Sequence, residues 1–145
     1  MSHIRTRLRH NIVTTLTGLT RTKGNCFDTR VFAVHEGVLP AICVYTQSET
    51  SRYPTMGPPR TLQKKLIARI EIYVKMTGTY DEMVDEISAD IEEALYTDLT
   101  RGGLAIDTRL VSIDTDFSAD GDQPVMVGRL TCEVDYLAVE GSPEG

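Results

Sequence analysis

The sequence predicts an α+β fold, in which two helices pack on a twisted antiparallel sheet of about four to five strands. Two segments repeat apolar residues every three or four positions, which is typical of a helix with one buried face. Several others alternate apolar and polar residues, as half-buried strands do. Strands joined by turns pair antiparallel, and the one-sided helices must cover a sheet face. The predicted order is α-β-β-β-α-β-β.

The first predicted helix has an apolar stripe that includes Ile4 and Leu16. Ser2 is its candidate cap, and Gly18 marks its end. A loop over residues 20–29 precedes a short strand, "RVFAV", at residues 30–34, and a turn that ends at Pro40. The second strand, "AICVYTQSE", begins with a nearly continuous apolar run. We therefore expect that beginning to be buried on both faces.

An unusually long connection follows, because hairpin loops generally have about 2–5 residues. Residues 48–61 contain three prolines, one glycine and two arginines, and we interpret them as an extended flexible arm. The clearest strand then runs from Leu62 to Met76 with strict alternation. Lys64 interrupts its apolar face next to the arm.

The second helix begins at "TYDE", where Thr79 and Glu82 have the spacing of a capping box. Its apolar stripe ends before "TDLTRGG". Two final strands follow. In the first, Val111, Ile113 and Phe117 alternate with polar residues, and "SADGDQP" is a turn before the second. We expect one domain over residues 1–139 and a disordered tail over residues 140–145, because a chain of 145 residues suits a single core.

Composition excludes several classes of protein. No apolar run approaches the roughly 18–20 residues that span a bilayer, so we expect no membrane contact. The basic N-terminal segment lacks the continuous apolar stretch of a secretory signal, which predicts assembly in a cytoplasm. The three cysteines are far apart and form no metal-binding or disulfide pattern, so we expect Cys43 and Cys132 to be buried apolar groups.

The sequence contains no catalytic, cofactor or metal signature. The stretch "DFSADGDQPVMV" begins like a calcium loop, but Val127 stands where a bidentate glutamate is required. His3 and His10 lie two helical turns apart, which is too far for one metal ion. Basic residues are not interleaved with aromatic ones, as nucleic-acid binding would favour. These residues offer only weak candidates for a catalytic or metal site.

Charge is segregated along the chain, although the net charge is only -6. Residues 1–30 and 52–75 are basic, whereas residues 79–98 carry acidic side chains and no basic ones. Opposite patches of this kind suit contacts between copies or neighbouring proteins. The candidate interface residues are Arg52, Tyr53, Arg60, Lys64, Asp85, Glu92, Asp116 and Asp120.

The layout as a whole resembles the tail terminator, or tail completion, proteins of long-tailed bacteriophages, the minor tail protein U class. The resemblance covers about residues 4–137. It rests on "LPAICVY", on an acidic helix that follows "EIYV", and above all on the closing "DTDFSADGDQPVMVGRLTCEVDY". No single one of these motifs is diagnostic, because a layout rather than a catalytic signature defines the family.

The resemblance implies a virion structural protein of the tail or neck that is not an enzyme and needs no cofactor. Such proteins are expected to form a hexameric ring on the head-proximal end of the tail tube, to stop polymerisation of the major tail tube protein, and to meet the head-tail connector proteins. DNA would pass through the ring without being specifically bound. The acidic turn Asp114–Asp122 is a candidate lining of that channel, since like charges repel DNA.

The arm with Arg52, Tyr53 and Arg60 is then interpreted as a docking element that reaches a neighbouring subunit or the tube. One alternative is another neck or head-tail connector subunit. A second alternative, from a different class, is a small ligand-binding or enzymatic module with a pocket under the arm, for which Cys26 with His35, or Asp116 with Asp120, are the candidate pairs.

Overall fold

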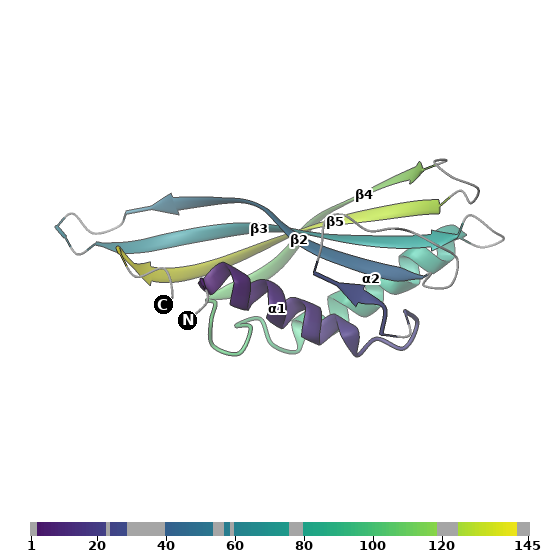
Figure 1. Ribbon diagram of the computed structural model, residues 1–145, viewed down its shortest axis with the longest axis horizontal. Coiled ribbons are helices and arrows are strands. Elements are labelled where there is room, and N and C mark those ends of the chain that lie inside the picture. Colours follow the sequence, from purple (N-terminus) through teal and green to yellow (C-terminus); the bar gives the residue numbers. More distant parts are fainter. Residues whose placement is uncertain are drawn as a thin grey trace.

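The structure is a computed structural model that describes residues 3–22, 24–28, 40–53, 57–58, 60–75, 80–118 and 125–141. These residues form a five-stranded sheet in the order β1-β2-β3-β5-β4, with both helices on one face (Figure 1). The predicted α+β class and the order of elements are confirmed. The elements are α1 (Ile4–Thr17), β1 (Cys26–Phe27), β2 (Ala41–Arg52), β3 (Thr61–Lys75), α2 (Tyr80–Tyr96), β4 (Asp107–Ser118) and β5 (Val125–Val139).

Strands β3 and β5 form the centre of the sheet. They pair antiparallel without interruption from Thr61 opposite Val139 to Lys75 opposite Val125. The alternation predicted for β3 is confirmed, because its even-numbered apolar residues from Leu62 to Val74 are buried. The start of β2, Ala41–Val44, is buried at every position, as expected from its continuous apolar run.

Each helix buries one stripe against this sheet. In α1 the buried residues follow four-residue steps from Ile4 to Leu16, and Gly18 is the C-cap, as predicted. The predicted cap Ser2 lies outside the described residues, and His3 occupies the N-cap position, where its Nδ1 accepts a hydrogen bond from the Arg5 amide. In α2 the buried residues are Val84, Ile87, Ile91 and Leu95. Thr79 of the expected capping box also lies outside the described residues.

Helix α2 lies very close to β5 at Gly128. A methyl group placed on Gly128 would lie 2.8 Å from Cγ1 of Val84, which is well inside van der Waals contact. Val84 is buried and β-branched, so its side chain has few other rotamers. The absence of a side chain at Gly128 therefore sets how closely the helix packs on the sheet.

The N-terminal edge of the sheet differs from the prediction. The segment expected to be a loop contains β1, which pairs parallel with β2 through Cys26 opposite Ile42 and Phe27 opposite Cys43. The sheet is therefore mixed and not wholly antiparallel. The strand predicted at residues 30–34 and the turn containing His35 lie outside the described residues.

Strand β4 departs from simple alternation. Leu110 is opposite Cys132 and Ser112 is opposite Thr131, so Val111 is an extra residue in a β-bulge. After the bulge, Ile113 lies opposite Leu130 on the helix-bearing face. Val111 and Ile113 are 49% and 46% exposed, so the prediction that they share one apolar face was wrong. One inserted residue places every later side chain of the strand on the opposite face of the sheet from the one that strict alternation predicts.

Strand β2 is longer than predicted. It continues to Arg52, which pairs with Gln63 of β3, so the first part of the expected arm is an antiparallel ribbon. In Figure 1 this ribbon, with the end of β5, extends past the helices at the left of the view. Neither described helix is both long enough and apolar enough to cross a membrane.

Candidate functional site

The end of the β2–β3 ribbon carries three of the predicted interface residues. Tyr53 is 54% exposed, and the guanidinium carbon of Arg60 lies 5.4 Å from the centre of its ring. Arg60 Nε is also 3.0 Å from Glu140 Oε2, and the two residues share backbone contacts. The charge of Arg60 is thus balanced within the subunit, and Glu140, predicted to belong to a disordered tail, is held against the ribbon.

Arg52 and Lys65 supply the available positive charge of this ribbon. Both side chains are exposed, and neither has an ion-pair partner among the residues that the structure describes. The predicted role of Arg52 in a contact between proteins is compatible with this position. Together with Tyr53, these two residues define what we call the ribbon tip.

Lys64, in contrast, belongs to an internal cluster. Its Nζ lies 3.6 Å from Glu49 Oε2, and the two side chains are only 13% and 9% exposed. Glu49 also accepts hydrogen bonds from Tyr136 and from Arg5 of α1. Burial, followed by the neighbouring carboxylate of Glu49, raises the pKa of Tyr136. Lys64 therefore helps to fix α1 on the sheet, and its role in an interface stays a prediction.

The acidic face of α2 is only partly neutralised. Arg21 lies 3.3 Å from Glu86 and 2.6 Å from Asp90, which joins the loop after α1 to α2. This contact raises the pKa of Arg21, chiefly through its hydrogen bond to Asp90. The remaining acidic side chains are exposed and have no ion-pair partner among the described residues: Asp81, Glu82, Asp85, Glu92 and Glu93.

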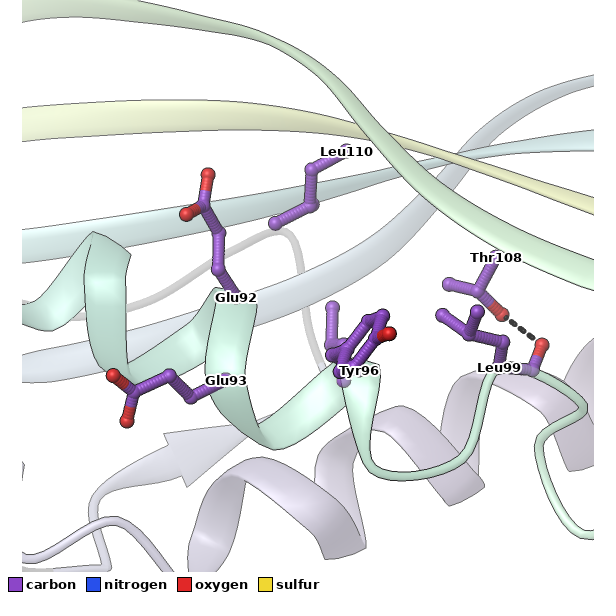
Figure 2. Close-up of a pocket in the computed structure, with 7 residues that line it drawn as sticks. Glu92, Glu93, Tyr96, Leu99, Thr108 and Leu110 are labelled. Carbon is purple, nitrogen blue, oxygen red and sulfur yellow. Dashed lines mark hydrogen bonds between the residues drawn. The ribbon is translucent and has the colours of Figure 1, made fainter.

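Two of these carboxylates border a groove between α2 and β4 (Figure 2). The groove has a volume of about 490 Å³ and is open to solvent. Leu95, Leu99 and Leu110 provide apolar surface, and Thr108 Oγ1 donates a hydrogen bond to the Leu99 carbonyl at 2.8 Å. Tyr96 is 76% exposed and lines the groove together with Leu99 and Thr108 (Figure 2). The residues that line the groove are Glu92, Glu93, Leu95, Tyr96, Leu99, Thr108 and Leu110.

Sequence reasoning selected Glu92 but missed this groove. Its walls come from α2, the following loop and β4, and no local pattern connects them. One signal was present in the sequence. Tyr96 directly follows the last stripe residue Leu95, so a large aromatic ring had to lie off the buried face of the helix.

The predicted acidic turn is only partly described. Asp116 is exposed on β4, with Oδ2 3.7 Å from Nη1 of Arg129. Arg129 Nε in turn lies 2.7 Å from the buried carboxylate of Glu71, which also accepts a hydrogen bond from Tyr73. Asp116 is therefore attached to a polar network on the face without helices. Asp120 lies outside the described residues, and so does the candidate pair that it would form with Asp116.

The same face of the sheet carries a second charged cluster around Arg109. Its guanidinium lies 2.9 Å from Asp107, 3.1 Å from Glu133 and 2.8 Å from Asp135. These contacts raise the pKa of Arg109, chiefly through the hydrogen bond to Asp135. One arginine among three carboxylates leaves this part of the surface acidic.

The candidate metal-binding and catalytic groups of the sequence analysis can be located only in part. The described residues include no group of three His, Cys, Asp or Glu side chains placed to hold a metal ion. Nε2 of His10 lies 3.0 Å from Oδ2 of Asp28. The pairing of Cys26 with His35 falls partly outside the described residues.

The cysteines are poor nucleophiles in the folded protein. Burial raises the pKa of Cys26 to about 11 and the pKa values of Cys43 and Cys132 to about 12. Cys43 and Cys132 are fully buried, as the sequence predicted. We expect a chromogenic disulfide reagent at pH 8 to modify Cys43 and Cys132 only after unfolding, and Cys26 more slowly than a free cysteine.

The same pKa shifts predict how stability depends on pH. Because the folded pKa values exceed the ordinary thiol value, the neutral thiols stabilise the folded protein fully below pH 9, and this contribution decreases as the pH rises through 11 to 12. Denaturant unfolding at pH 8 and pH 10 measures this change, and we expect a lower free energy of unfolding at pH 10. Rapid modification of all three thiols under native conditions at pH 8 would contradict the buried positions.

Comparisons with known proteins point to one family. A family model described as "Phage minor tail protein U" matches residues 3–114. No curated protein matches the chain. Among solved structures, the chain is similar to one in "Virion of native gene transfer agent (GTA) particle", with 12% sequence identity, a TM-score of 0.39 and coverage of 92% of each chain. A structural similarity of that level carries no functional conclusion.

Proposed function

The chain belongs to the phage minor tail protein U family, and we propose that it is a tail terminator. In this proposal, copies of the chain form a ring on the head-proximal end of the tail tube. The ring stops addition of the major tail tube protein and then presents its other surface to the head connector. The function requires binding surfaces and neither catalysis nor a cofactor. The observation that carries the proposal is the family match over residues 3–114.

The distribution of charge supports a ring. In a closed ring, two different surface patches of each subunit meet those of its neighbours. Arg52 and Lys65 lie on the ribbon, whereas Glu92 and Glu93 lie on α2, and none of these four has an ion-pair partner among the described residues. Unsatisfied charges of opposite sign on separate elements are suited to contacts between different patches.

The exposed edge of β4 also supports a role in assembly. In the described sheet, β4 is the last strand and has only β5 as a neighbour. No described strand pairs with its other edge, whose backbone groups are suited to pairing with another chain. The exposed residues Val111 and Ile113 add apolar surface on this strand. Asp114 and Asp116 remain candidates for an acidic channel that DNA passes without binding.

A tube-growth assay tests this function. Purified chain is added to major tail tube protein while the tubes polymerise, and tube lengths are measured by negative-stain electron microscopy. We expect growth to stop and a ring to be visible at one end of each tube. An unrelated acidic protein of similar size is the control. Tubes that grow to the same lengths with and without the chain would contradict the proposal, and a ring found only on purified head connectors would favour the connector alternative.

A further inference from the structure

The groove between α2 and β4 has the chemistry of a binding site for a cationic, aromatic segment. Its floor is apolar and comes from Leu95, Leu99 and Leu110. Glu92 and Glu93 line the same groove with exposed carboxylates that have no ion-pair partner among the described residues. The exposed ring of Tyr96 offers a stacking surface at its side (Figure 2).

The ribbon tip has the complementary chemistry. Tyr53 exposes about half of its surface, and Arg60 lies against its ring. Because the salt bridge to Glu140 holds Arg60 in place, the ring is positioned before any partner binds. Arg52, next to Tyr53, carries a charge that no described residue neutralises. An aromatic ring beside a free guanidinium matches an apolar groove with a carboxylate rim.

The ribbon tip and the groove of one subunit lie apart. The ribbon extends past both helices (Figure 1), whereas the groove lies between the end of α2 and β4 (Figure 2). This separation leaves the groove open to the ribbon tip of another copy. A contact between two different patches of identical subunits is heterologous, and repeated around an axis it closes a ring.

We propose that the ribbon tip of one subunit docks into the α2–β4 groove of the next subunit. Tyr53 enters the groove next to Tyr96, and Arg52 pairs with Glu92 and Glu93 at its rim. This inference rests on the ring of the proposed function and specifies the contact that forms it. It assigns the groove to a second copy of this chain, and contact with the tail tube protein is left to other surfaces.

Cysteine cross-linking tests the contact directly. In a Cys26→Ser background, Tyr53→Cys is introduced into one preparation of the full chain and Tyr96→Cys into another. The two are mixed under mild oxidation, both free in solution and after addition to tail tubes. We expect a disulfide-linked dimer that contains one copy of each variant. Asp85→Cys replaces Tyr96→Cys in the control mixture, because Asp85 is exposed on α2 but does not line the groove.

A charge exchange gives an independent test. We expect Arg52→Glu to weaken association between subunits by about tenfold or more, the effect of losing about 1.4 kcal/mol. Glu92→Arg should have a similar effect, and the double variant Arg52→Glu with Glu92→Arg should recover most of the association. Asp85→Arg, with the same change of charge on the same helix, should not rescue Arg52→Glu.

The results separate this contact from the function above. A disulfide between the Tyr53→Cys and Tyr96→Cys variants in either setting, together with rescue of Arg52→Glu by Glu92→Arg, supports the contact. This holds even if the chain does not stop tube growth. If the chain stops tube growth but no cross-link forms in either setting, the terminator function stands and the contact is wrong. Equal rescue by Asp85→Arg would show only a general effect of net charge and would overturn the pairing.

Discussion

Replacing Gly128 with valine is expected to lower the free energy of unfolding by about 3 kcal/mol, at the upper end of the usual cost of overpacking. A Cβ atom at this position would lie 2.8 Å from Val84 Cγ1 and 3.9 Å from the side chain of Ile72. All these groups are buried in the core, and Val84 cannot rotate away cheaply. Helix α2 would have to move off the sheet. Urea unfolding followed by circular dichroism measures the change.

A second glycine provides the matched control for Gly128. Among the described residues, no atom beyond its chain neighbours lies within 4 Å of a Cβ placed on Gly57, so Gly57→Val should change stability by no more than about 0.5 kcal/mol. The close approach between Gly128 and Val84 is tested with Gly128→Ala and Val84→Ala, singly and together. The double variant should lose less than the sum of the single losses by about 1 kcal/mol, because Val84→Ala removes the clashing methyl. Strict additivity would contradict the close approach.

Replacing Arg101 with methionine is expected to lower the free energy of unfolding by about 2–4 kcal/mol, because the buried, charged guanidinium of Arg101 donates hydrogen bonds that methionine cannot form. Arg101 is 1% exposed, and its Nη2 donates hydrogen bonds to the carbonyls of Leu95 and Asp98 at the end of α2. Its Nη1 also donates to Asn11 Oδ1 of α1, at 3.3 Å. The positive guanidinium thus caps the negative end of one helix and joins it to the other.

The effect of Arg101 depends on its hydrogen bonds and not only on its volume. Methionine keeps much of the length of the side chain but leaves the carbonyls of Leu95 and Asp98 without their donor. Arg52→Met is the control, since the same change at an exposed site should cost less than about 0.5 kcal/mol. Arg101→Lys should recover part of the loss, because an ammonium group can still donate. Equal unfolding midpoints for Arg101→Met and Arg52→Met would contradict this role.

Local periodicity predicted the elements that have many residues and one buried face. Strand β3 and helix α2 were identified because their apolar residues repeat over many positions. Strand β1 was missed because a strand of two residues, stabilised by pairing with β2, has no period. The exposed faces of β4 were misassigned because the bulge at Val111 depends on pairing with β5 and leaves no mark in the local sequence.

The candidate site was less predictable, because its charges are balanced by residues distant in sequence. Arg60 is neutralised by Glu140 and Lys64 by Glu49, and neither partner could be identified from spacing. Arg21 uses two of the carboxylates in the acidic helix, so the segregation of charge in the sequence overstates the charge that remains exposed. Once these internally paired charges are set aside, Arg52 and Glu92 remain as exposed charges that have no ion-pair partner among the described residues. The groove between α2 and β4 likewise exists only in three dimensions.

In the proposed function, copies of this chain act at the head-proximal end of a phage tail. The most direct measurement locates the chain on assembled tails by gold labelling of an affinity tag, followed by electron microscopy. We predict a gold label at the head-proximal end of each tail and none along the tube. Label distributed along the whole tube, or gathered at the distal tip, would contradict the claim.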